Sequence, residues 1–135
     1  MREKRSAGFA AAGFLALAAW IAGCGGVDRP DLAPVRGKVT LDGRPLPDAR
    51  LEFQPVGPWR TSMGVTDARG EYELSYIRDE KGAAVGGHRV RITTVGRTEA
   101  EPEIVPAKYN EQTQLEREVT AGRNRIDFKL TSDAP

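Results

Sequence analysis

Hydrophobic and polar residues alternate in short runs from Val35 to near the end of the chain. In the run VRGKVTL, Val35, Val39 and Leu41 share one face, and polar residues occupy the other. A period of two predicts a β-strand with one face buried and the other in water. The same pattern predicts six further strands, at 49–55, 61–66, 71–76, 88–95, 114–119 and 125–131.

The alternation also predicts which side chains point into the core. One charged residue, Arg117, shares the inward phase with Leu115 and Val119. We expect it at the rim of a sheet, where its aliphatic stem covers apolar surface and its guanidinium stays in water. The other inward residues are aliphatic or aromatic: Leu51, Phe53, Met63, Val65, Tyr72, Leu74, Tyr76, Val90, Ile92, Ile126, Phe128 and Leu130.

Turn signals separate these runs. Asp42-Gly43 is a strong one, because a type I′ turn needs positive φ at both central residues. The sequence DARG makes a second turn, and Ala121-Gly122 is expected to join the last two strands as a hairpin. Seven short strands without helical periodicity after residue 24 predict an all-β sandwich of about a hundred residues.

The N-terminal segment has a different pattern. Arg2, Lys4 and Arg5 precede an apolar stretch over 7–22 that is rich in alanine and leucine. A basic region, an apolar region and small residues at the end form the layout of a helical secretory signal peptide. A retained membrane helix is the alternative, since the stretch approaches the length that spans a bilayer. The small residues before Cys24 favour cleavage.

The sequence IAGC, which ends at Cys24, resembles the lipobox of bacterial lipoproteins. The resemblance implies that the Cys24 thiol receives a diacylglycerol, that the chain is cut before it, and that the new amine is acylated, for example with palmitate. Several acyl chains anchor a protein durably, whereas a single chain binds only marginally. An incidental cysteine at the end of an ordinary signal peptide is the alternative.

The ten residues after Cys24 contain Gly, Pro and Asp, which oppose regular structure. We therefore expect a signal peptide at 1–23, a lipid-anchored flexible tether at 24–34 and the sandwich at 35–132. Extended, the tether would reach some 30 Å, at about 3.3–3.6 Å per residue. Gly25, rather than Asp, after the cysteine favours the outer membrane, and the expected location is the periplasmic side of the cell envelope.

Composition narrows the chemistry. The chain has 20 basic and 19 acidic residues, which argues against nucleic-acid binding, since that needs a basic surplus on one face. It has one cysteine, so neither an internal disulfide nor a cysteine-based zinc site is expected. No run of calcium-ligand residues occurs. We therefore expect no cofactor and no metal.

A second resemblance covers Val35 to Leu130. It is carried by VRGKVTLDGRPLPDARLEFQPVG, GVTDARGEYELSY, GGHRVRI, PAKYN and NRIDFKL, in this order. Together they resemble the small transthyretin-like lipoproteins of planctomycetes, which are related to the carboxypeptidase regulatory-like domain. This resemblance implies a seven-stranded, prealbumin-like (Ig-like) sandwich, and it implies no established activity.

Catalysis is not expected. The 5-hydroxyisourate hydrolase, an enzyme of transthyretin-like fold, uses histidines, an arginine and a C-terminal Tyr-Arg-Gly-Ser motif. This chain has one histidine, His88, and ends with LTSDAP. No serine lies in a nucleophile-elbow context such as G-x-S-x-G. We interpret His88 as a solvent-facing residue at the start of a strand.

Four residues are candidate ligand contacts: Trp59, Lys108, Tyr109 and His88. An exposed Trp59 could stack on a sugar or peptide, or cap the open end of the core. For Tyr109 we favour packing of its ring on the sandwich, with its hydroxyl fixing the long loop. The expected function is a membrane-anchored, non-enzymatic binding or structural module with an unidentified glycan or protein partner. The alternative is a carbohydrate- or peptide-binding accessory to an envelope hydrolase or transport system.

Overall fold

The computed structural model describes residues 29–94 and 102–132, and in this part the protein is all-β, as the alternation predicted. The predicted signal peptide, Cys24 and the first residues of the tether lie outside the described residues. Within them, the one helix is a short 3-10 turn, η2 (Ala107–Tyr109). The described residues include no helix long and apolar enough to cross a membrane.

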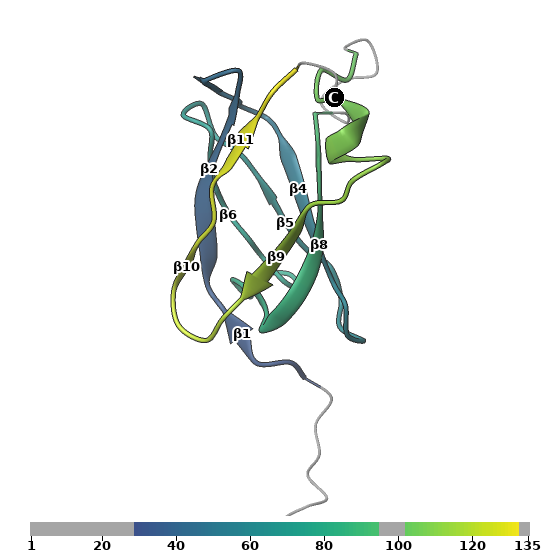
Figure 1. Ribbon diagram of the computed structural model, residues 1–135. Helices are drawn as coiled ribbons and strands as arrows, with labels where there is room; N and C mark the ends of the chain where they lie inside the picture. Colours follow the sequence, from purple (N-terminus) through teal and green to yellow (C-terminus); the bar gives the residue numbers. More distant parts are fainter. Residues whose placement is uncertain (1–28, 95–101, 133–135) are drawn as a thin grey trace, which may run out of the picture.

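Two larger sheets form the layers of the fold (Figure 1). The central strand of the first is β2 (Val35–Leu41), and around it lie antiparallel β3 (Arg44–Pro45) and β6 (Glu71–Glu73) and parallel β10 (Asn124–Arg125) and β11 (Phe128–Leu130). The second sheet is antiparallel, in the order β5 (Ser62–Val65), β4 (Arg50–Pro55), β8 (Gly86–Thr93) and β9 (Glu116–Val119). A small ribbon pairs β1 (Leu32–Ala33) with β7 (Ala83–Ala84).

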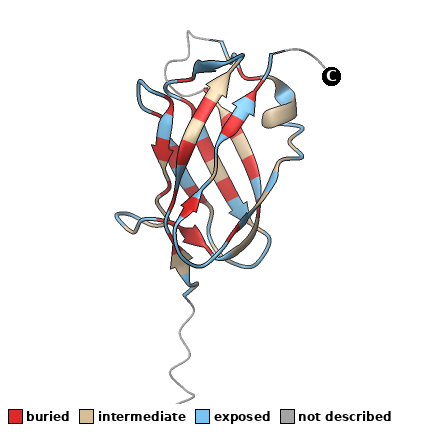
Figure 2. Ribbon diagram, turned by 60° about the vertical axis from the view of Figure 1, so that its left-hand side comes forward, coloured by how far each residue is buried: buried red, intermediate tan, exposed pale blue. Residues whose placement is uncertain are grey.

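The core lies between the two sheets. Figure 2 shows buried residues alternating with exposed or intermediate ones along the strands. This alternation arises because successive side chains of a strand point to opposite faces. Most of the predicted inward residues are confirmed by complete or nearly complete burial: Val35, Val39, Leu51, Phe53, Tyr72, Leu74, Val90, Ile92, Phe128 and Leu130.

Gly37 lies where the backbone of β2 closely approaches the backbone at Ile126. A Cβ atom there would lie 1.9 Å from the carbonyl oxygen of Ile126, so only glycine fits. The parallel ladder between β2 and the last strands is interrupted at this point. The Asp127 carboxylate accepts the Lys38 N–H at 2.8 Å, and the Tyr72 hydroxyl donates to the Ile126 carbonyl at 2.5 Å. These side chains replace the missing backbone pairing.

The predicted inward residues of β5 are wrong. Met63 and Val65 are 46% and 59% exposed, whereas Ser62 and Gly64 point inward. A Cβ on Gly64 would lie 2.8 Å from the Glu73 carbonyl oxygen. The inward face of this strand is therefore crowded by the neighbouring backbone and accepts only small residues.

The predicted last hairpin is also wrong. β9 pairs with β8 in the second sheet, whereas β10 and β11 pair with β2 in the first. The turn at Ala121-Gly122 therefore crosses from one sheet to the other. Asn124 holds this crossing: its amide donates to the carbonyls of Pro34, Thr120 and Gly122 and accepts the Thr120 N–H.

The last residues of the predicted tether belong to the fold. Leu32 and Ala33 form β1, the Asp31 carbonyl accepts the Val85 N–H at 2.9 Å, and Arg29 is ion-paired with Glu80. The first described strand thus lies before Val35. We call the end that carries β1 the proximal end; it also holds the loops 56–61 and 76–81 and the crossing 120–123. The opposite end, with the turns 42–43 and 67–70 and η2, is the distal end (Figure 1).

Candidate functional site

The four candidate ligand residues do not form one site. Trp59 and His88 are near the proximal end, because Trp59 follows the last residue of β4, which pairs with His88. Lys108 and Tyr109 are in η2 at the distal end. No single ligand of ordinary size can contact all four residues.

His88 is not solvent-facing, which corrects its sequence interpretation. It is 2% exposed, and it shares the inward phase of β8 with Val90 and Ile92. Nε2 lies 2.7 Å from the Ala84 carbonyl oxygen, so Nε2 carries the proton and donates. The ring is tilted against Phe53 at 5.7 Å between centroids. Nδ1 finds no hydrogen-bond partner among the described residues. His88 is thus a core residue.

Arg117 pairs with His88 in the β8–β9 register. Its guanidinium carbon lies 4.9 Å from the centre of the Phe128 ring, a cation–π distance. The side chain therefore spans the gap between the sheets, since β9 and β11 belong to different sheets. It covers the edge of the core, as the rim interpretation predicted. Beside it lies a shallow depression of about 350 Å3 that includes Val56 and Glu118.

Tyr109 and Lys108 belong to the scaffold of the distal end. The Tyr109 ring packs against the core, and its hydroxyl oxygen accepts the Thr131 N–H at 3.1 Å. Burial acts to raise the pKa of Tyr109, but the hydrogen bonds of Thr131 and the charge of Lys108 outweigh it and lower the pKa below its ordinary value. The Lys108 amine lies 5.2 Å from the ring centre. The pair ties η2 to the end of β11.

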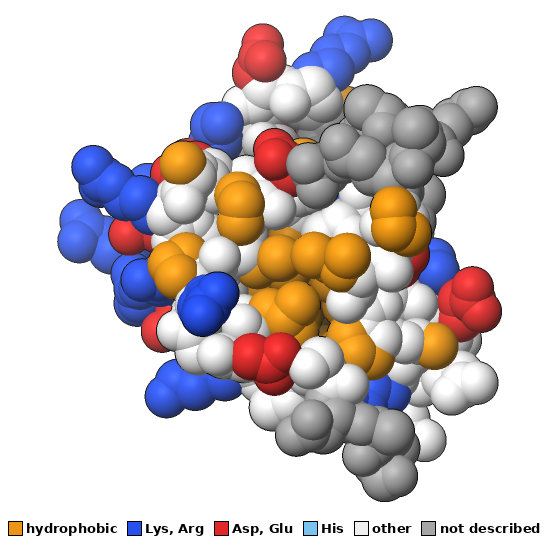
Figure 3. Space-filling model, turned by 90° about the horizontal axis from the view of Figure 1, so that it is seen from above, with side chains coloured by type: hydrophobic (Ala, Val, Ile, Leu, Met, Phe, Trp, Pro, Cys, Tyr) orange, Lys and Arg blue, Asp and Glu red, His pale blue; other side chains and the backbone are white. Residues whose placement is uncertain are grey.

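Asn110, the residue after η2, fixes the loop that carries η2 to the end of β8. It is buried, and its side-chain nitrogen donates to the carbonyls of Ile92, Val105 and Pro106 at 3.0–3.3 Å. Figure 3 views this end from above and shows hydrophobic side chains gathered in its middle, with basic ones along one edge. Exposed Ile104 and half-buried Leu41 and Tyr109 are at this end.

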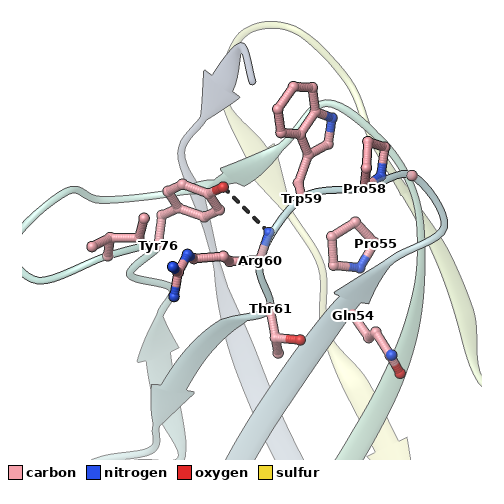
Figure 4. A pocket seen from close by; sticks show the side chains of 9 residues that line it. Gln54, Pro55, Pro58, Trp59, Arg60, Thr61 and Tyr76 are labelled. Carbon is pink, nitrogen blue, oxygen red and sulfur yellow. Dashed lines mark hydrogen bonds between the residues drawn. The ribbon is translucent and has the colours of Figure 1, made fainter. Parts of the chain in front are cut away.

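A pocket around Trp59 is a candidate for ligand contact. It is an open depression of about 600 Å3 between the loop after β4 and the loop after β6. Figure 4 shows Trp59 and Tyr76 on either side of the Arg60 backbone, with Pro55 and Pro58 on the side away from Tyr76. The Tyr76 hydroxyl accepts the Arg60 N–H at 3.3 Å. The two prolines and this bond restrict the loop.

The pocket combines flat aromatic surface with polar groups. Gln54, Arg60 and Thr61 contribute an amide, a guanidinium and a hydroxyl, and no acidic residue lines it. Such a site can hold the face of a ring and hydrogen-bond its edges. Among the residues that line it, the pocket has neither a nucleophile next to a base nor a pair of carboxylates.

Sequence reasoning identified only Trp59 in this pocket. Tyr76 was expected in the core with Tyr72 and Leu74, but it is half-buried and lines the pocket. The strand β6 ends at Glu73, so the period of two no longer applies at position 76. The sequence PVGPWRT does carry a usable signal, because a valine between two prolines, followed directly by a tryptophan, is unusual in a polar loop.

Among residues 29–94 and 102–132, no three His, Cys, Asp or Glu side chains gather as a metal ion would require. Comparisons of the chain with protein-family models, with curated proteins and with solved structures found no match. The resemblance to transthyretin-like lipoproteins therefore stays a prediction.

Proposed function

We propose that this protein is a lipid-anchored lipoprotein of the cell envelope whose β domain is a non-enzymatic binding module. The observation that carries the binding role is the open pocket of Trp59 and Tyr76, which offers ring surface and polar groups without catalytic side chains. The anchor is supported by the sequence IAGC, which ends at Cys24, five residues before the first described residue. In this proposal the domain faces the periplasm, on the outer membrane.

We also propose that the fold is the prealbumin-like sandwich of the transthyretin-like lipoproteins of planctomycetes. Support comes from the two facing sheets and from the seven strands of three or more residues: β2, β4, β5, β6, β8, β9 and β11. The four remaining strands, each of two residues, extend these sheets or fasten the N-terminal segment to β7.

The anchoring is tested by expression in a bacterium that carries the lipoprotein-processing enzymes, with labelled palmitate in the medium. The wild-type protein should take up label and fractionate with membranes. Cys24→Ser should lose the label, because serine offers no thiol for the thioether. Val27→Ser, three residues beyond, should keep it. Labelled, membrane-bound Cys24→Ser would contradict the proposal.

A second candidate function is that of a carbohydrate- or peptide-binding accessory. It is favoured by the composition of the pocket, where Trp59 offers a ring face and Gln54 and Arg60 offer hydrogen-bonding groups. Processed protein in detergent should then bind in a glycan and peptidoglycan screen, and Trp59→Ala should abolish the signal. Met63→Ala, on the outer face of β5, is the matched control.

A further inference from the structure

We propose that the proximal end of the domain docks on the bilayer surface, with Val56 and Trp59 in the membrane interface. This inference rests on the proposed lipid anchor at Cys24. It assigns a second, non-covalent membrane contact to the loop 56–61, and therefore a fixed orientation of the domain. The occupant of this surface is the lipid bilayer itself, so the lipid headgroups are the ligand of the Trp59 pocket, and the carbohydrate-binding candidate is the competing use of the same pocket.

Val56 is the first observation. It is 83% exposed, more than any other large hydrophobic residue that the structure describes. Its position is fixed, because its N–H donates to the Gly87 carbonyl at 3.0 Å. Exposed Val85 lies at the same end, where its N–H is bonded to Asp31. Two exposed aliphatic side chains therefore lie at the proximal end, which is the end nearer the proposed anchor.

The length of the connecting chain is the second observation. Five residue steps separate Cys24 from Arg29, which is ion-paired with Glu80. At about 3.3–3.6 Å per step, this segment spans at most about 18 Å. The acylated cysteine lies at the membrane surface, so the proximal end stays within that distance of the headgroups. A short anchor keeps the effective concentration of the loop at the bilayer high.

The chemistry of the loop is the third observation. Tryptophan and tyrosine prefer the membrane interface, where the ring meets the acyl boundary and its polar atom meets water. Trp59 lies beyond the end of β4 (Figure 4). Arg60 is the single charged residue between Gln54 and Thr61, and it has the sign that anionic headgroups attract.

The test uses a property of the processed chain. Trp20 belongs to the predicted signal peptide, so in a chain that starts at Cys24, Trp59 is the only tryptophan. Acylated protein is reconstituted in vesicles of phosphatidylcholine and phosphatidylglycerol, and Trp59 fluorescence is recorded with and without brominated lipid. We expect a blue shift and quenching by brominated lipid, with reduced quenching by aqueous acrylamide.

Val56→Asp should reverse these changes, because a carboxylate is repelled by anionic lipid. The exposed position lets this variant fold. Ile104→Asp, 49% exposed in the wild type and at the distal end, is the matched control and should behave as the wild type. Docking is contradicted if Trp59 of vesicle-bound protein is quenched by acrylamide and not by brominated lipid.

The two proposals fail in different ways. Without acylation, the protein lacks the palmitate label, which overturns the anchor. With acylation but a water-exposed Trp59, the anchor stands and the docking is overturned. A third outcome is that Trp59 is not quenched by brominated lipid but becomes protected from acrylamide when a glycan is added. This outcome would overturn the docking and favour the carbohydrate-binding candidate.

Discussion

His88 donates a hydrogen bond from Nε2 to the carbonyl oxygen of Ala84, at 2.7 Å. Ala84 belongs to β7, which pairs with β1, the first strand that the structure describes. The imidazole itself packs on Phe53 in the core of the second sheet. This one contact therefore links the core to the ribbon from which the proposed anchor extends.

Replacing His88 by alanine should lower the free energy of unfolding by about 2–4 kcal/mol, because it leaves a cavity and an unpaired carbonyl. Urea unfolding followed by Trp59 fluorescence of the processed chain measures the loss. Arg89→Ala, at the exposed neighbouring position, should change stability by less than about 0.5 kcal/mol. Equal effects of the two substitutions would contradict a core role for His88.

Tyr72→Phe should destabilise the first sheet by about 1–2 kcal/mol, since the carbonyl of Ile126 loses its donor. Burial and the nearby charge of Asp127 raise the pKa of Tyr72, so its hydroxyl keeps its proton at neutral pH. The ring remains, so the loss reports the hydrogen bond and not a cavity. Hydrogen exchange at the Ile126 amide, which is bonded to Arg36, should accelerate in the variant.

Asp67 should make stability depend on pH. The backbone N–H groups of Glu71 and Arg69 donate to its carboxylate and lower its pKa in the folded protein. The group therefore stabilises the fold above its unfolded pKa, at about pH 4, and this stabilisation is lost as the pH falls through the lower folded value. On acidification, wild type should lose more stability than Asp67→Asn. Parallel pH profiles would contradict this.

Asn110→Ala should release the loop that carries η2. Three carbonyls lose their donor inside the distal end, and the expected cost is about 1–3 kcal/mol. Asn110→Asp should be no better, because a carboxylate cannot donate to carbonyls. Proteolysis of the segment 102–113 provides the readout. It should be faster in both variants than in Glu111→Ala, an exposed neighbour.

Alternation was sufficient to predict the strands with the strongest pattern. Val35 and Val39 in β2, Leu51 and Phe53 in β4, and Val90 and Ile92 in β8 are all completely buried. These strands lie in the middle of their sheets, so one face of each must carry large apolar residues. His88 is two residues before Val90, so the alternation along β8 places it on the same inward face as Val90 and Ile92. The alternation therefore indicated that the histidine is buried, although its polarity suggested exposure.

The remaining features depend on neighbours that a single run of sequence does not reveal. Gly64 is inward because the Glu73 carbonyl approaches it, which displaces Met63 and Val65 to the outer face. The sequence after Val119 resembles a hairpin, yet Asn124 directs the chain to the other sheet. The Trp59 pocket needs Tyr76 from a second loop. Long-range contacts of this kind decided each discrepancy.

The central claim is lipid attachment at Cys24, and mass spectrometry of the N-terminal peptide of membrane-extracted protein tests it most directly. The account predicts a chain that begins at Cys24, with a diacylglycerol on the sulfur and an acyl group on the amine. Proteins extracted from Cys24→Ser cells supply the reference. A chain that retains residues before Cys24, or one that carries an unmodified thiol there, would contradict it.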